Sequence, residues 1–158
     1  MEPLNFVYVT YILSTPEKVW NAIVDPEVTK KYWSDPLSKN PAHINVSEWK
    51  VGSFWKHVRM DENKTVDLVG KVLEVNPPTK LVISWARPDE MNDESIHSRV
   101  TFEISHYADG LVRLAVNHEG LDSQMFNGIS NGWPSVLSNL KTYLESGLPL
   151  AGHINEKK

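Results

Sequence analysis

The 158-residue sequence contains no cysteine, and this absence excludes several kinds of site. Without thiols the chain forms no disulfide bond, no thiolate zinc site and no cysteine nucleophile. No apolar segment approaches the roughly 18–20 residues that a membrane-spanning helix needs. The N-terminus, MEPLNFVYVTYIL, has no basic segment and no small-residue cleavage site, so it does not resemble a signal peptide. We therefore expect a cytoplasmic protein that does not insert into a membrane.

The charge balance argues against nucleic acid as a partner. Lysine and arginine number 16 against 20 aspartates and glutamates, which gives a formal net charge of −4. A nucleic-acid-binding domain normally presents a basic surface. The hydrophobic share of 41% and the charged share of 23% are those of an ordinary globular domain. The length predicts a single domain over residues 1–150, followed by a flexible C-terminal tail over 151–158.

The clearest helical pattern lies near the C-terminus, over residues 130–150. Its large apolar residues recur every three or four positions, as one stripe of a helix requires: Trp133, Val136, Leu137, Leu140, Tyr143 and Leu144. Pro134 fits the first turn of this helix, and Gly147 fits the left-handed position just past its end. A shorter helical segment before it, ending at Ile129, would then be separated from it at Pro134 by a kink or a break.

Most of the remaining chain predicts strands joined by short turns. Segments rich in β-branched and aromatic residues indicate strands at 6–13, 44–51, 54–60, 65–75, 80–86, 96–106 and 111–119. Two short helices are expected after the first strand, because residues 14–17 and 25–27 each place a proline directly after a capping residue. Consecutive strands on short turns favour a mostly antiparallel sheet with segregated helices, which is the α+β class.

Five segments occur in the order found in a known family: PEKVWNAIVDPEVTKKYW (16–33), GKVLEVNPPTKLVISW (70–85), RVTFEI (99–104), NHEGL (117–121) and NGWPSVLSNLKTYLESGLPL (131–150). With them the chain resembles the bacterial stand-alone relatives of the activator of heat shock protein 90 ATPase C-terminal domain. That family belongs to the START-like (SRPBCC) superfamily of helix-grip folds. The resemblance implies a curved, mostly antiparallel sheet of six to seven strands wrapped around the long C-terminal helix. It also implies two short helices after the first strand and a cavity between sheet and helix.

The leading hypothesis is non-catalytic binding of a small hydrophobic molecule, lipid-, flavonoid- or polyketide-like, in that cavity. The expected lining consists of inward strand residues, the helix stripe and nearby tryptophans: Trp33, Trp49, Trp55, Leu68, Leu81, Ile83, Trp85, Val100, Phe102, Leu114, Val116, His118, Ile129, Trp133, Val136, Leu137 and Leu140. For Trp133, as for Trp20, anchoring a helix to the sheet is the competing interpretation. The loops at 34–43 and 87–95 are the expected portals.

His118 is the best candidate for acid–base chemistry. A histidine pKa near 6.5 suits proton transfer at neutral pH. Its neighbour Glu119 points to the opposite face of the strand, and no Gly-x-Ser-x-Gly motif accompanies it. A buried, hydrogen-bonded structural histidine is therefore the competing interpretation. The histidines show no metal-binding spacing and the acidic loop at 87–95 lacks the calcium-loop pattern, so we expect no metal and no other cofactor.

Two other functions stay open. The resemblance implies an interaction module for a chaperone partner, which would show an exposed apolar patch and little internal void. A cyclase- or hydrolase-type enzyme would instead need a polar group such as His118 facing the cavity with a shifted pKa. The expected quaternary state is a monomer or a weak homodimer.

Overall fold

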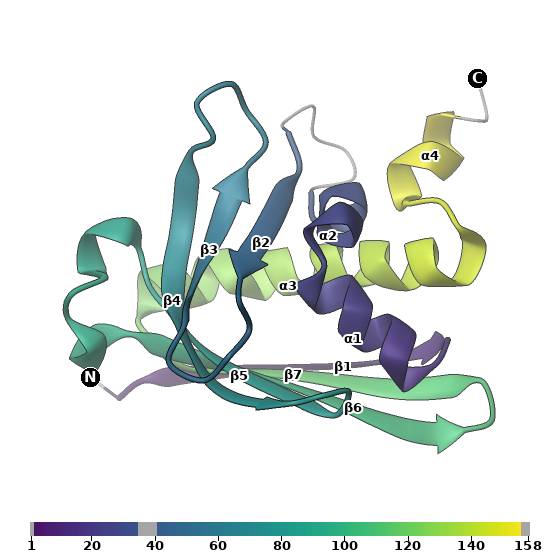
Figure 1. Cartoon of the computed structure of the whole chain (residues 1–158), viewed down its shortest axis with the longest axis horizontal. Coiled ribbons are helices and arrows are strands. Elements are labelled where there is room, and N and C mark those ends of the chain that lie inside the picture. The colour runs from purple at the N-terminus through teal and green to yellow at the C-terminus, as the bar shows by residue number, and fades with distance from the viewer. Residues whose placement is uncertain (1, 35–40, 156–158) are drawn as a thin grey trace.

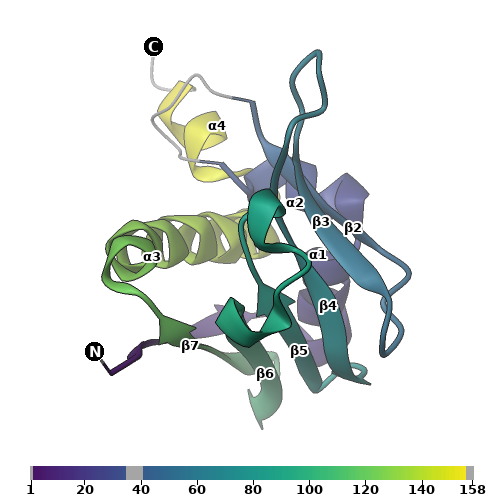
Figure 2. The same ribbon diagram turned by 90° about the vertical axis from the view of Figure 1, so that its left-hand side faces the viewer.

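A seven-stranded antiparallel sheet curves around one long helix in the computed structural model, which describes residues 2–34 and 41–155 (Figures 1 and 2). The strand order is β1-β7-β6-β5-β4-β3-β2. The strands are β1 Leu4–Leu13, β2 His43–Ser47, β3 Phe54–Arg59, β4 Val66–Asn76, β5 Lys80–Trp85, β6 Ser98–Ala108 and β7 Leu111–Leu121. The helices are α1 Pro16–Val24, α2 Pro26–Tyr32, α3 Ser123–Ser146 and α4 Leu150–Asn155, with short 3₁₀ helices η1 Pro88–Glu90 and η2 Glu94–Ile96. The predicted α+β class and helix-grip arrangement are confirmed.

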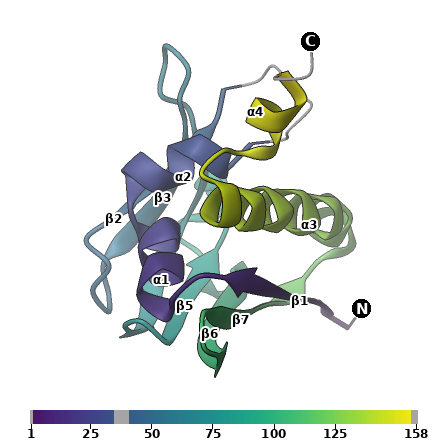
Figure 3. The same cartoon turned by 90° about the vertical axis from the view of Figure 1, so that its right-hand side faces the viewer.

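Helices α1 and α2 begin where the sequence predicts, for the expected reason. The side chain of Thr15 accepts a hydrogen bond from the backbone of Lys18, and that of Asp25 accepts one from Glu27. A proline occupies the first turn of each helix, where its missing N–H leaves no bond unmade. Figure 3 shows both helices packed beside α3 on the same face of the sheet.

Helix α3 continues through Pro134, so of the two predicted alternatives, a kink or a break, the break into two helices is wrong. The helix begins at the Asp122 cap and ends at Gly147, whose φ of 86° is the expected left-handed conformation. A proline inside a helix costs about 3 kcal/mol, because it removes one hydrogen bond and crowds the preceding turn. The buried stripe continues on both sides of Pro134, from Ile129 to Leu140. Burial of several large side chains, at about 1.5–3 kcal/mol each, outweighs that cost.

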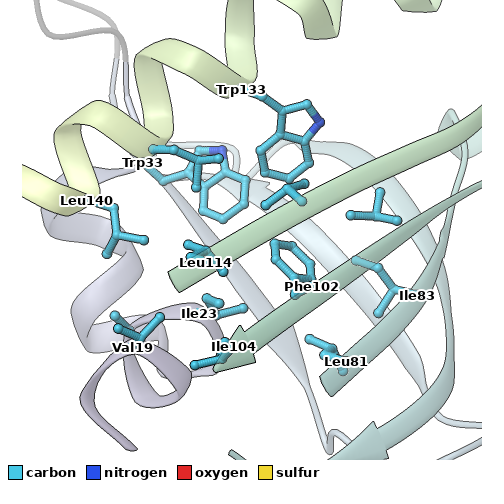
Figure 4. Close-up of a cluster of buried hydrophobic side chains, with 14 of the residues drawn as sticks. Val19, Ile23, Trp33, Leu81, Ile83, Phe102, Ile104, Leu114, Trp133 and Leu140 are labelled. Carbon is cyan, nitrogen blue, oxygen red and sulfur yellow. The ribbon is translucent and has the colours of Figure 1, made fainter. Parts of the chain in front are cut away.

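The core fills the space between the concave face of the sheet and the helices (Figure 4). The predicted alternation in β6 is confirmed, because Val100, Phe102 and Ile104 are all buried. Phe102 is 2% exposed and its ring meets that of Trp133 edge-on, with the ring centroids 5.8 Å apart. These contacts fix the face of α3 that is turned toward the sheet.

Helices cover both edges of the sheet. At β1, Lys141 Nζ donates to the carbonyl of Tyr11 over 2.7 Å, and Glu145 accepts from the backbone N–H of Leu13 over 2.8 Å. At β2, the N–H of His43 donates to the carbonyl of Trp33 at the end of α2. An uncovered edge invites pairing with another chain, and these bonds occupy part of each edge strand.

Helix α4 occupies the start of the segment for which we predict a flexible tail. The amide of buried Asn139, on α3, accepts from the N–H of Leu150 and donates to the carbonyl of Tyr32. The flexibility of this end of the chain stays a prediction. Of the portal predicted at 34–43, residues 35–40 lie outside the described residues. Over 2–34 and 41–155, no helix is long and apolar enough to cross a membrane.

Candidate functional site

A cavity of about 140 Å³ lies between α3 and strands β3 to β5. Its lining comes from the end of α2, these strands and one face of α3: Trp33, His57, Leu68, Trp85, Gly128, Ile129, Gly132, Trp133 and Val136. An engineered cavity of about 150 Å³ in another protein accepts one benzene molecule. The space here therefore suits a single aromatic ring.

Tryptophan rings form a rigid wall on one side of the cavity. The ring centroid of Trp133 lies 5.7 Å from that of Trp33 and 5.5 Å from that of Trp85. Figure 4 shows Trp33 and Trp133 side by side above Phe102 and Leu114. Separations of 4.5–7 Å with tilted or edge-on rings are the favoured arrangement of aromatic pairs. The wall is thus held in place by the core beneath it.

His57 supplies one polar atom of the lining. On the sheet it lies between Asn45 of β2 and Leu68 of β4. Its Nδ1 is 2.6 Å from Asn45 Oδ1, which only accepts, so Nδ1 carries the proton. Burial, with a smaller contribution from His43, lowers the pKa of His57 to about 3, although Asp67 acts in the opposite direction. The ring is therefore neutral at pH 7, with Nε2 as a hydrogen-bond acceptor.

An ion pair behind His57 fixes the orientation of its ring. Arg59 donates to both carboxylate oxygens of Asp67, over 3.1 and 2.9 Å, and Nε2 of His43 lies 2.7 Å from the same carboxylate. Partial burial opposes ionisation of Asp67, but hydrogen bonds from His43 and Arg59 hold its pKa below the usual range. The ring of His43 then stacks on His57, with the planes 2° from parallel and the centroids 4.3 Å apart.

Trp85, another lining residue, carries an unpaired donor. The residue is 6% exposed, and its buried Nε1–H meets no acceptor within the described part of the chain. An unpaired buried donor costs about 1–3 kcal/mol, and such groups are rare in native proteins. This N–H has less than 1 Å² of accessible surface, so it is enclosed by the core and is not exposed to the cavity.

His118, the candidate for acid–base chemistry, lies behind Trp133 and outside the cavity lining. Trp133 Nε1–H donates to its Nδ1 over 3.1 Å, so the ring proton sits on Nε2, which donates to Ser98 Oγ over 2.8 Å. The Ser98 hydroxyl in turn donates to the carbonyl of Trp85. Burial lowers the pKa of His118 to about 3. Both nitrogens are used within the fold, which is the arrangement of a structural histidine.

The structure brings part of the expected lining together at this cavity: Trp33, Leu68, Trp85, Ile129, Trp133 and Val136. Other residues of that prediction pack in the core without lining it: Leu81, Ile83, Val100, Phe102, Leu114, Val116, Leu137 and Leu140. Two tryptophans have structural partners instead, since Trp55 donates to the carbonyl of Ser84 and Trp49 to that of Val24. A role of any of these residues in ligand binding stays a prediction.

His57, Gly128 and Gly132 line the cavity but are absent from the predicted set. The alternation of Trp55 and His57 on β3 was the available signal for the histidine. The glycines are exposed, and a Cβ at either position would meet nothing within 4 Å. A helical glycine costs about 1 kcal/mol relative to alanine, and no neighbour requires one here. The cavity therefore reaches the surface beside the glycines, not at the predicted portal 87–95, which contributes no lining residue.

Other features of the described residues give weaker candidates. A surface hollow of about 490 Å³ is lined by charges of both signs, among them Lys80, Glu103 and Arg113, and by no tryptophan. Within 2–34 and 41–155, no three histidine or acidic side chains are grouped as a metal site requires. The tryptophan-lined cavity is the better defined site, because the three tryptophans of its lining are buried and packed against one another.

A family model described as "Activator of Hsp90 ATPase homolog 1-like protein" matches residues 14–145. The chain belongs to this family. Among solved structures, an HSP90 activator from Plasmodium falciparum is 19% identical with a TM-score of 0.70, over 89% of this chain and 96% of that one. The Aha1 dimer from Colwellia psychrerythraea is 19% identical with a TM-score of 0.71, over 91% and 98%.

A further solved structure, of a protein from Cytophaga hutchinsonii, is 24% identical with a TM-score of 0.68, over 91% of this chain and 95% of that one. Identities this low establish the shared fold of the Hsp90 activator homologues and not a shared activity. A comparison with curated proteins finds no match. The function must therefore be argued from the site.

Proposed function

We propose that this Hsp90 activator homologue is a non-catalytic binding protein for a small aromatic molecule of about one ring. The ligand lies in the cavity between α3 and the sheet. The observation that carries the proposal is a cavity of about 140 Å³ walled by the packed rings of Trp33, Trp85 and Trp133. Aromatic walls with a few polar groups are typical of ligand sites. We place this binding in the cytoplasm.

The size of the cavity makes the proposal narrower than the sequence-based hypothesis. Sites for drug-sized ligands measure about 300–1,000 Å³. A volume of about 140 Å³ leaves no room for a long acyl chain or a fused polycyclic ligand unless the walls move. We therefore propose molecules of one ring as ligands, instead of the lipid-, flavonoid- or polyketide-like molecules that the sequence-based hypothesis names.

Apolar burial alone gives such a ligand a modest affinity. A ring that buries about 150 Å² gains about 4 kcal/mol at 25 cal/mol per Å², which corresponds to a Kd of about 1 mM. A tighter ligand must also use the polar atoms of the wall.

A ligand series of increasing size tests the proposal. We would titrate the protein with toluene, naphthalene and decanoate and follow the Trp signals by NMR. Toluene should bind saturably and the larger ligands should not. Val136→Phe, which extends a lining residue into the cavity, should abolish toluene binding, whereas Val7→Phe on the exposed face of β1 should not. Equal binding of toluene by both variants contradicts the proposal.

A protein-interaction role is the second candidate, favoured by a row of exposed apolar side chains on the outer face of β1. Val7 and Leu13 are 60% and 62% exposed, and Val9 and Tyr11 lie between them on the same face. Such a row fits a chaperone partner or a second copy of the chain. Two structural relatives are described as an HSP90 activator and as a dimer. Sedimentation of Val7→Glu and wild type, alone and with Hsp90, tests this candidate, since the variant should lose any association.

A further inference from the structure

Strand β1 lies at one end of the described sheet, where its neighbour is β7, and the pairing is regular from Phe6 to Leu13. Successive residues of such a strand direct their backbone N–H and carbonyl alternately toward the neighbour and away from it. Two bonds assign these directions in β1. The N–H of Ser14 donates to Gly110, at the turn into β7, and the N–H of Leu13 donates to Glu145 of α3. Even-numbered residues of β1 therefore face β7, and odd-numbered residues face the free edge.

This free edge is covered by α3 near its C-terminal end, through the bonds of Lys141 and Glu145 (Figure 3). Within residues 2–34 and 41–155, no group bonds to the outward N–H and carbonyl of Val7 and Val9. Backbone groups without a protein partner normally face water. Val7 is itself 60% exposed. The first half of the edge is therefore open to pairing with another strand.

The open stretch also lacks the charges that usually protect an edge. Residues 3–13 contain no lysine, arginine, aspartate or glutamate. Edge strands of natural proteins commonly carry such residues, above all lysine, and these oppose pairing. On β7 the partners of Val7 and Val9 are Asn117 and Ala115, which are uncharged as well. In a contact around a twofold axis a residue at the axis meets its own copy, so a charge there would repel itself. The neutral edge thus favours a second copy of this chain as its partner.

We propose that two copies of the chain form a dimer by antiparallel pairing of the first halves of their β1 strands. The two sheets then form one continuous antiparallel sheet across a twofold axis beside Val7. This inference goes beyond ligand binding in the cavity. It rests on the protein-interaction candidate and names the second copy of the chain as the partner.

The bonds of α3 select the register of this pairing. With Val7 opposite its own copy, Asn5 lies opposite Val9, and Tyr11 lies opposite Pro3. Because proline has no N–H, the carbonyl of Tyr11 keeps its bond from Lys141. A register centred on Val9 would instead need the carbonyl of Tyr11 and the next outward N–H, and α3 binds both of these groups.

The size of the contact predicts a weak dimer. Five paired residues span about 17 Å, and with a sheet about 10 Å thick they bury about 200–400 Å² on each copy. A stable complex buries about 800 Å² on each side. We therefore expect a Kd of about 0.1–1 mM.

The absence of native cysteine makes crosslinking a direct test. In the proposed register the Cα atoms of the two copies of Val7 are about 5.5 Å apart, within the roughly 4.4–6.8 Å that a disulfide spans. Val7→Cys at about 1 mM, with diamide as the oxidant, should form covalent dimers about tenfold faster than Leu13→Cys. Leu13 is the matched control, because it is 62% exposed on the same face of β1 but would lie about 40 Å from its own copy.

A proline variant tests the backbone bonds. Val7→Pro removes an N–H that faces away from β7, so the pairing of β1 with β7 is retained. Sedimentation equilibrium up to about 1 mM should show dimers of the wild type and of Val7→Thr, which keeps the N–H, but not of Val7→Pro. Circular dichroism checks that Val7→Pro is folded. If it is not, the comparison of the two cysteine variants decides.

Each contrary outcome is distinct. A wild-type protein that stays monomeric overturns the proposed dimer and leaves the exposed row of β1 to a chaperone partner. Dimers that crosslink equally through Val7→Cys and Leu13→Cys overturn the edge pairing, while the protein-interaction candidate stands. Dimers that persist in folded Val7→Pro overturn it as well. Faster crosslinking of Val7→Cys together with a monomeric Val7→Pro supports the pairing.

Discussion

Trp133 donates a hydrogen bond from its indole N–H to Nδ1 of His118, over 3.1 Å. The bond joins α3 to β7 and holds the tryptophan that forms the centre of the cavity wall. It also fixes the neutral form of His118, whose other nitrogen is bonded to Ser98. A residue that the sequence offers for catalysis thus serves to position the wall.

Replacement of His118 should destabilise the protein strongly. His118→Ala leaves the donor of Trp133 unpaired and opens a void, so we expect a loss of about 3–4 kcal/mol in the free energy of unfolding. His118→Gln can retain one bond and should lose less. Urea unfolding measures both. His106→Ala, at an exposed histidine of β6, is the control and should change stability by less than about 0.5 kcal/mol. Equal losses in the two alanine variants would show that the hydrogen bonds of His118 do not contribute to stability.

Stability should fall steeply with acidification between about pH 6 and pH 4. His57 and His118 have pKa values near 3 in the folded protein and about 6.5 when unfolded, so the unfolded state binds more protons in this range. Their contribution is complete above pH 6.5 and decreases by about 1.4 kcal/mol per pH unit for each histidine as the pH falls. The pKa values of Asp61, Asp67 and Glu145 are also lowered in the folded protein, and their contributions decrease only as the pH falls through the ordinary values of 3.8 for aspartate and 4.5 for glutamate.

Urea unfolding at half-unit pH steps checks this slope. His118→Gln should retain about half of it, because only His57 then remains. A free energy of unfolding that stays constant from pH 6.5 to pH 4.5 would contradict the burial of two neutral histidines.

Two glycine-to-alanine changes should act in opposite directions. At Gly70, on β4, an added Cβ would overlap the carbonyl oxygen of Ser84 and Nε1 of Trp55, so we expect a loss of more than about 3 kcal/mol. At Gly132, an added Cβ meets nothing within 4 Å, and the better helix propensity of alanine should stabilise by up to about 1 kcal/mol. Thermal unfolding measures both, and a stabilised Gly70→Ala variant would contradict the close packing of β4 on β5.

Loss of the cover on β1 should promote association. The double change Lys141→Ala and Glu145→Ala frees the carbonyl of Tyr11 and the N–H of Leu13, next to the exposed apolar row of that strand. We expect concentration-dependent dimers or larger species in light scattering. Arg99→Ala with Glu103→Ala removes the same two charges from β6, a central strand, and should leave the protein monodisperse. Identical behaviour of the two double variants would argue against a protective role.

The sequence predicts the fold well because its signals are local. Thr15 and Asp25 with their following prolines mark the starts of α1 and α2, and alternation in β6 assigns the buried face. The sequence-based prediction fails at Pro134. There the burial of Ile129, Trp133 and Leu137 along one helix outweighs the tendency of proline to end a helix. A tertiary gain of this kind is invisible without the partner surface.

The candidate site was harder to predict than the fold. A cavity needs inward-facing apolar residues, but the packing of the core decides which of them border an open space. Phe102 and Leu114 face inward and pack in the core, and neither lines the cavity. His57 was missed because its neutral state depends mainly on its burial, and the position of its proton on Asn45 of the neighbouring strand. The unused donor of Trp85 likewise appears only when every possible partner has been placed.

The most direct test of the central claim is a ¹H–¹⁵N NMR titration of the protein with toluene. If the cavity is the binding site, the indole signals of Trp33, Trp85 and Trp133 and the amides of Gly128 and Gly132 should shift together and saturate near 1 mM, while those of Val7 and Leu13 stay unchanged. Shifts absent from the cavity, or confined to the outer face of β1, would contradict the account and leave the protein-interaction role as the function to pursue.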